Sequence, residues 1–316
     1  MKNSIGITAA LAVGFGLAAA AHADTNLVTN PNFVGTGGVG GYGEFFPDQS
    51  VSANKKPAYA VDIAGWNAPQ TNAINQNAPF LFSVDPTTID TTGFYDSWDQ
   101  GTRTLWGKAN GGAEIGSGIA AGPPNGATSA LLLDADYNIT PIYQVIDPSK
   151  LTVGDKYTIS FDYAIDQWAQ NSGPTTEGIE IGLGGRVVQV ASINPTTGVN
   201  GFSLASHTFE GWTPFSATFT YTGNPTTMTY GLDYGGETFT AAANWLTFIG
   251  EGSPQGLPPT ILLTGVSLTQ APSDTPDYIN PGVPEPATWA LMMIGIGGLG
   301  AIARRRRAAG LAAVAA

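Results

Sequence analysis

The chain has 316 residues, of which 42% are hydrophobic and only 11% are charged, with a formal net charge of −12 and no cysteine. The apolar supply is sufficient for a real core, and the absence of cysteine excludes disulfides, zinc–thiolate sites and thiol nucleophiles. Five of the 12 basic residues, Lys2 and Arg304–Arg307, lie at the ends of the chain, so the middle of the chain contains the remaining seven. Such an acidic middle lacks the basic patch that phosphate binding needs, which excludes nucleic acid as a partner.

The N-terminus has the three parts of a secretory signal peptide. Lys2 supplies the positive charge, an apolar run follows, and Ala21 and Ala23 fit the small-x-small cleavage pattern. The sequence therefore predicts a signal peptide over residues 1–23 and Asp24 as the first mature residue. The alternative is an N-terminal membrane anchor, but the apolar run is shorter than the roughly 20 residues that a membrane span needs.

The middle of the chain reads as one β-rich domain over residues 24–270. Short runs alternate apolar and polar residues and are bounded by Gly, Pro, Asn and Asp, which is typical of strands and turns. The candidate strands are 129–133, 157–163, 179–183, 187–190, 215–221, 228–232 and 261–268. This pattern predicts an all-β fold, a jelly-roll β-sandwich. Residues 35–125 are loop-rich and are expected at one end of the sandwich, while residues 271–283 read as an extended linker.

The C-terminal end carries the most specific pattern in the chain. Pro284, Glu285 and Pro286 come first, and prolines expose a short extended segment. An interfacial Trp-Ala pair and an apolar run follow, and a basic cluster that the positive-inside rule keeps cytoplasmic ends the pattern. The residues after the first motif are Trp289, Ala290, 291–303, Arg304, Arg305, Arg306 and Arg307. The pattern predicts a single C-terminal transmembrane helix that stops translocation; an ordinary tail anchor is the alternative.

This order of motifs resembles the PEP-CTERM sorting domain in its PEPxxWA variant, over residues 284–308. The same domain is also known as the ice-binding protein C-terminal domain. The resemblance implies processing by an exosortase, a membrane-embedded cysteine protease of Gram-negative bacteria that make exopolysaccharide. It also implies a transient inner-membrane anchor that faces the periplasm, followed by transport to the outer surface or the exterior. Residues 309–316 are a short apolar tail beyond the usual end of such domains.

Several segments of the middle resemble galactose-binding-like jelly rolls. The matching segments are Asn26–Phe33, Gly65-Trp66, 142–145, 151–157, 160–164, 256–259 and 263–268. Two positions depart from the pattern: Val34 stands where Glu is usual, and Thr264 stands where Asp is usual. In related carbohydrate-binding modules those acids help to hold a structural calcium ion, so the resemblance does not carry that site over to this chain.

Cofactor signals are weak, and no cofactor or metal is expected. Asp134, Asp136 and Asn138 imitate the start of a calcium loop, which leaves a structural calcium ion as an open alternative. Such a loop needs Gly at its sixth position and Glu at its twelfth, where this chain has Ile139 and Val145.

The sequence contains no catalytic motif, which predicts that the domain is not an enzyme. His207 is the one histidine left after signal cleavage, no Gly-x-Ser-x-Gly motif accompanies it, and one histidine is too few for a histidine metal site. A secreted polysaccharide hydrolase remains the alternative, and it would need two convergent acids. Glu177 with Glu180, and Asp162 with Asp166, are the nearest candidates.

Aromatic residues are the better indication of binding. The domain contains Trp66, Trp98, Trp106, Trp168, Trp212 and Trp245. Trp98 and Trp106 flank a polar loop and are predicted to form a glycan-binding platform, with core packing as the alternative for each. The sequence thus predicts an exported surface protein that associates with exopolysaccharide or the envelope through a glycan. A minor alternative is an ice-binding protein, which would require a flat, regular threonine array, and the sequence contains no such repeat.

Overall fold

The computed structural model of the protein describes residues 25–38, 43–45, 60–68, 81–85, 94–96, 101–108, 111–116, 122–135, 141–190, 202–230, 237–254 and 259–278. The predicted signal peptide with its cleavage residues, Trp98 and the whole sorting tail lie outside the described residues. Within the described part of the chain, no helix is both long and apolar enough to cross a membrane.

The fold is all-β and is built around two sheets, which confirms the all-β part of the predicted fold class. The larger sheet has nine strands, in the spatial order β1 (Gly35–Gly37), β3 (Ala60–Ile63), β2 (Gly43–Phe45), β4 (Leu81–Val84), β8 (Ala130–Asp134), β18 (Pro259–Ala271), β10 (Lys156–Gln167), β14 (Thr208–Thr220) and β7 (Ala113–Ile115). The smaller sheet has the order β12 (Arg186–Gln189), β11 (Thr175–Leu183), β17 (Trp245–Ser253) and β9 (Ile142–Val145), with β13 (Phe202–Leu204) beside β11. Two separate hairpins pair β15 (Thr226–Tyr230) with β16 (Glu237–Ala241), and β5 (Phe94–Asp96) with β6 (Gly101–Arg103).

The main core lies between the two sheets. In β10, Ile159 and Phe161 are buried and point inward, whereas Thr158 is only partly buried and points outward. Ile181 of β11 and Phe248 of β17 belong to the same buried cluster. Alternation with a period of two therefore places one face of each sheet in a shared core, which is the packing of a β-sandwich.

Most of the predicted strands are confirmed, and one central strand was missed. The hairpin around Gly184-Gly185 forms as predicted, with Leu183 opposite Arg186. β17 was not predicted, because its apolar residues do not alternate with polar ones. Phe248 faces the main core, while Ile249 is buried on the other face against Met228 of β15. A strand covered on both faces loses the period-two signal.

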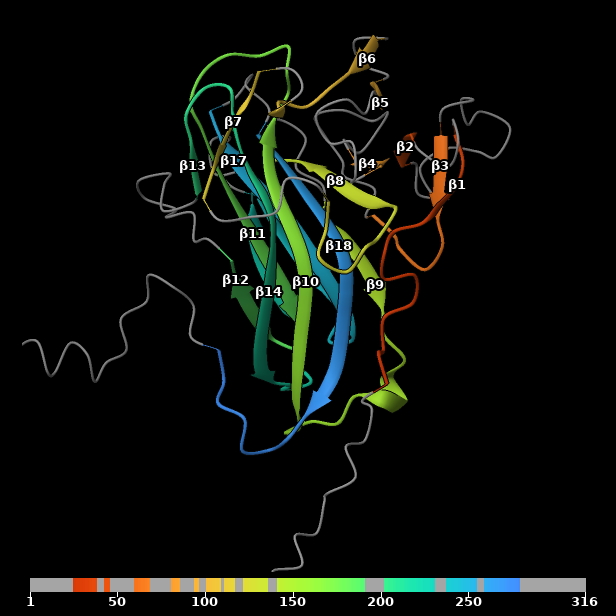
Figure 1. Ribbon diagram of the computed structural model, residues 1–316. Helices are drawn as coiled ribbons and strands as arrows, with labels where there is room; N and C mark the ends of the chain where they lie inside the picture. The colour runs from red at the N-terminus through yellow and green to blue at the C-terminus, as the bar shows by residue number, and fades with distance from the viewer. Residues whose placement is uncertain are drawn as a thin grey trace, which may run out of the picture.

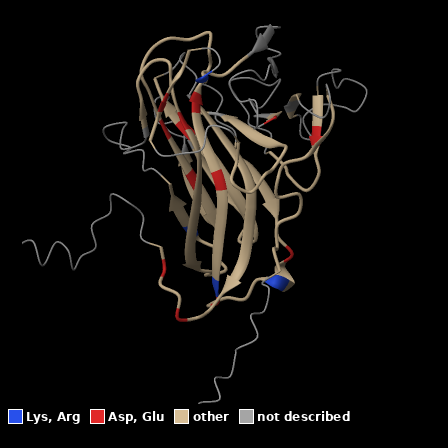
Figure 2. Ribbon diagram, in the orientation of Figure 1, with Lys and Arg blue, Asp and Glu red and all other residues tan. Residues whose placement is uncertain are grey.

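The loop-rich region contributes seven short strands, which gather at the upper end of the molecule in Figure 1. Part of it covers the outer face of the larger sheet, where Leu105, Trp168 and Trp212 form a second buried cluster with Leu132 and Leu262. Below this end, the long strands β10, β14 and β18 run on with few charged side chains, as Figure 2 shows.

The start of the predicted linker belongs to the folded body. β18 extends through Ala271, and the following residues turn back onto the sandwich. Tyr278, the last described residue, donates its backbone N–H to the carbonyl of Thr218 at 2.6 Å and its hydroxyl to the carbonyl of Gln189 at 3.0 Å. Since Thr218 is in β14 and Gln189 in β12, this segment joins one edge of each sheet.

Candidate functional site

Trp106, one of the two tryptophans predicted to bind a glycan, is half-buried and already engaged. Its indole N–H donates to the carbonyl of Asn171 at 3.2 Å, and its ring lies against the ring of His207 with centroids 4.2 Å apart. The other predicted tryptophan, Trp98, lies outside the described residues. Trp66, Trp168 and Trp212 are buried at 3%, 5% and 1% exposure, so core packing accounts for them.

His207 pairs with a serine that no sequence pattern indicates. Its Nε2 lies 2.8 Å from Oγ of Ser172, and its backbone N–H donates to Oε1 of Gln167 at 3.0 Å. Among the described residues, no carboxylate contacts the imidazole. The pair therefore lacks the third group that orients the base in a catalytic triad.

The acid pairs that a hydrolase would need do not converge. Glu177 faces the main core, in line with Ile179, while Glu180 faces the opposite side of the same strand. Asp162 and Asp166 share the outer face of β10, but four residues of strand separate their Cα atoms by about 13 Å. The two carboxyls of a glycosidase lie roughly 5–10 Å apart.

Glu177 is instead the end of a buried hydrogen-bond chain. Nε2 of Gln167 donates to the hydroxyl of Thr175 at 2.8 Å, and that hydroxyl donates to Oε1 of Glu177. Oε2 of Glu177 has no partner within the described structure, and the side chain is fully buried. Burial raises the pKa of Glu177 to about 8, and the hydrogen bond from Thr175 opposes the rise. Glu177 is therefore mainly protonated at neutral pH.

Hydroxyl groups occupy the place where the jelly-roll pattern would carry a calcium-binding acid. The Thr264 hydroxyl donates to the carbonyl of Ser129 at 2.8 Å, and the Ser129 hydroxyl donates to the carbonyl of Phe33 at 3.1 Å. Oγ of Ser83 lies 3.2 Å from Oγ of Ser129. All three hydroxyl residues are buried, and their hydroxyls are engaged by local carbonyls and by one another. The described residues contain no group of three or more His, Cys, Asp or Glu that could hold a metal ion.

Three aromatic residues, which we term the aromatic cluster, meet on the outer face of the smaller sheet: Tyr143 of β9, Phe239 of β16 and Trp245 of β17. The rings of Tyr143 and Trp245 are stacked, with centroids 4.0 Å apart and an interplanar angle of 6°. Phe239 completes the cluster at 6.3 Å from Trp245 and 6.4 Å from Tyr143. All three side chains are half-buried, and Val145, opposite Trp245 in the strand register, is 50% exposed.

The hairpin of β15 and β16 brings Phe239 to this cluster by lying directly on the sheet. Met228 packs on Ile249 and covers Gly182. A Cβ atom at Gly182 would lie 2.5 Å from Sδ of Met228, so a larger residue there would force the Met228 side chain to shift. The hairpin thus covers the middle of the outer face and leaves the aromatic cluster at its rim.

The polar atoms of the aromatic cluster have no hydrogen-bond partner within the part of the chain that the structure describes. Neither the Trp245 indole N–H nor the Tyr143 hydroxyl has a hydrogen-bond partner among the described residues, although the backbone of Tyr143 pairs with Asn67. Burial raises the pKa of Tyr143, so the hydroxyl remains a donor. Half-exposed rings beside unpaired donors are the combination with which proteins hold a ligand that has both apolar and hydroxyl-bearing faces.

Sequence reasoning considered Trp245 only as one of six tryptophans and did not select the other two residues. Tyr143 and Trp245 are about a hundred positions apart in the chain, and no local pattern joins them. Their pairing depends on the register of β9 against β17, which is antiparallel and places Tyr143 opposite Thr247.

The comparison with protein families identifies the C-terminal end. Residues 282–307 match the PEP-CTERM protein-sorting motif. This motif marks an exported protein that is sorted to the cell surface and processed by an exosortase. No curated protein matches the sequence.

Solved structures share only a distant likeness with the chain. An α-L-arabinofuranosidase bound to arabinose is 13% identical with a TM-score of 0.31, over 78% of this chain and 26% of its own. A carbohydrate-binding module in complex with β-1,4-galactotriose is 10% identical with a TM-score of 0.26, over 78% of this chain and 99% of its own. A sugar-binding protein of Bacteroides thetaiotaomicron, assigned only provisionally to that role, is 11% identical with a TM-score of 0.29, and the match covers 78% of this chain and 100% of that protein's chain. Such low scores carry no argument about function, so the identification of this chain rests on its C-terminal PEP-CTERM protein-sorting motif.

Proposed function

We propose that the protein is an exported, exosortase-sorted glycan-binding protein that associates with exopolysaccharide or the envelope through its aromatic cluster. The single observation that carries the binding half of this proposal is the half-buried Tyr143–Trp245 stack, whose two polar groups have no hydrogen-bond partner among the described residues. The sorting half rests on the matched motif at residues 282–307.

The sorting proposal follows from the order of residues in the tail. Arg304–Arg307 do not cross the membrane cheaply, since each charge costs roughly 2.5–3.5 kcal/mol at the bilayer centre. The apolar run before them then anchors the chain transiently in the inner membrane and leaves Pro284-Glu285-Pro286 just outside its periplasmic face. Substitution of this tripeptide by Ala-Ala-Ala should trap the full-length chain in the membrane. An unchanged mass and location would reduce the tail to a plain anchor.

The chemistry of the domain favours an uncharged glycan. The domain is strongly acidic, and like charge disfavours anionic polymers. Stacked rings offer an apolar surface for the C–H face of a sugar, and the Trp245 indole N–H and the Tyr143 hydroxyl can donate to its hydroxyls. The acidic surface and the aromatic cluster therefore select for a neutral polysaccharide.

Glycan binding is testable with a tryptophan control inside the same domain. On an array of neutral glycans, the domain should bind, and Trp245→Ala should lower the affinity at least about tenfold, as loss of a buried aromatic anchor does. Trp106→Ala removes the other half-buried tryptophan and should leave binding unchanged. If only Trp106→Ala lost binding, the site would instead be the Trp106 position that the sequence predicts, and no binding by the wild-type domain would refute the glycan proposal.

One observation favours ice binding as a second candidate. Three adjacent strands of the larger sheet carry aligned outward hydroxyls, which we term the hydroxyl face: Thr158, Ser160, Ser216, Thr218, Ser267 and Thr269. Neighbouring strands lie about 4.8 Å apart and successive outward residues of one strand lie about 6.8 Å apart, while the hydroxyls of Thr158 and Thr218 lie 2.7 Å apart across the strands. An assay of ice-recrystallisation inhibition tests this candidate. Activity should be present and should be lost in Thr158→Lys but kept in Thr152→Lys, which changes an exposed loop; an inactive wild-type protein would refute it.

A further inference from the structure

Residues 272–278, which we term the strap, connect the end of β18 to the sorting motif and lie against the open edge of the sandwich. The strap ends in Tyr278, whose backbone and hydroxyl hydrogen bonds reach β14 and β12. The ring of Tyr278 also packs edge-on against Phe215, with centroids 5.5 Å apart. The strap is therefore held by both sheets immediately before the chain leaves the folded body.

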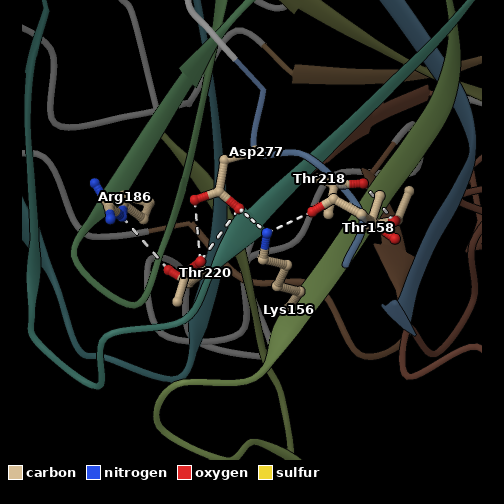
Figure 3. Close-up of polar contacts among 7 residues, drawn as sticks. Lys156, Thr158, Arg186, Thr218, Thr220 and Asp277 are labelled. Carbon is tan, nitrogen blue, oxygen red and sulfur yellow. Dashed lines mark hydrogen bonds and ion pairs between the residues drawn. The ribbon is translucent and has the colours of Figure 1, made fainter. Parts of the chain in front are cut away.

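A polar contact fixes the strap one residue earlier. The Asp277 carboxylate lies 3.2 Å from Nζ of Lys156 and accepts hydrogen bonds from the Thr220 hydroxyl at 3.0 and 3.2 Å (Figure 3). Lys156 also donates to the carbonyl of Thr275. The ion pair is partly exposed, with 21% of the Lys156 side chain and 43% of the Asp277 side chain accessible to solvent, so it is weak and readily opened.

The docked strap limits how far the sorting motif can extend from the domain. The matched motif starts at residue 282, four residues after Tyr278. From Tyr278 to Pro284 the chain spans at most about 20 Å, whereas from Ala271 it spans at most about 45 Å. A membrane-embedded exosortase has to receive the motif at the membrane surface. A docked strap holds the bulky sandwich close to the motif and therefore close to the enzyme.

We propose that release of the strap controls exosortase processing, with Lys156, Asp277 and Tyr278 as positioning residues for that reaction. This proposal rests on the proposed sorting function. Docking keeps the motif close to the folded body, and release adds the seven residues of the strap to the spacer. Processing is then proportional to the fraction of chains in which the strap is released.

Pulse–chase measurement of tail removal from the full-length chain in its exporting host tests the proposal. Asp277→Asn and Tyr278→Phe weaken docking without removing a core side chain, and each should speed processing about two- to fivefold. Asp274→Asn is the matched control, because it makes the same change at an exposed strap residue whose side chain has no contact in the described structure, and it should leave the rate unchanged. A seven-residue Gly/Ser insertion after Asn280 should speed processing and abolish the further effect of Asp277→Asn.

The outcomes separate this proposal from the one it rests on. If the wild-type tail is processed and Asp277→Asn is processed at the same rate or more slowly, the strap has no controlling role, although sorting stands. If the wild-type tail is not processed at all, the sorting proposal falls and the strap proposal falls with it.

Discussion

Replacing Glu177 by Gln should stabilise the folded domain at alkaline pH and leave it nearly unchanged at acidic pH. Glu177 is fully buried, and burial raises its pKa to about 8 from an ordinary value of 4.5. Between these values the folded state keeps a proton that the unfolded state has released. The free energy of unfolding therefore falls as the pH rises through this window and levels off above the folded pKa.

The size of the effect follows from the width of the window. One pKa unit corresponds to about 1.4 kcal/mol, so the full shift corresponds to an upper limit of about 5 kcal/mol lost between roughly pH 4.5 and pH 8. Gln has nearly the same shape, can accept the hydrogen bond from Thr175, and has no proton to lose in this range. We expect the two proteins to differ by less than about 1 kcal/mol at pH 5 and the variant to be more stable by a few kcal/mol at pH 9.

Urea denaturation of residues 24–278 at several pH values measures this difference directly. Burial also raises the pKa values of Glu180, Glu210 and Asp162, and their contributions cancel when the variant is subtracted from the wild type. If the Glu177→Gln difference is flat from pH 5 to pH 9, Glu177 is not protonated in the folded state and the assignment fails.

Two further substitutions and one mass measurement have defined outcomes. Thr264→Val removes the donor to the buried carbonyl of Ser129 and should cost about 1–3 kcal/mol in urea denaturation, whereas Thr264→Ser should keep most of the stability. Gly182→Ala drives a methyl group into Met228 and should cost about 1–3 kcal/mol; Met228→Ala in the same chain should recover part of that loss, and additive losses would contradict the contact. Mass spectrometry of the exported protein should find Asp24 at its N-terminus, and a terminus at Lys2 or Met1 would contradict signal cleavage.

The sequence alone identified what depends on residues that are close together in the chain. The sorting motif is a linear pattern, so its recognition needs no contact between distant residues, and the family comparison places it at residues 282–307. The strands with one buried and one solvated face were also recognisable, since period-two alternation records which face is buried. β10 and β18 are examples, because each predicted run lies within a longer strand.

Tertiary structure decided the features that depend on register between distant segments. The hydroxyl face has no repeat in the sequence, because Thr158, Thr218 and Thr269 become neighbours only when β14 and β18 pair with the two edges of β10. The Tyr143–Trp245 stack likewise depends on the pairing of β9 with β17, and the strap depends on two sheet edges that meet only in the folded sandwich. A single sequence records the face that each residue occupies on its own strand, but it does not record which strands are neighbours, because long-range pairing is set by the packing of the whole core.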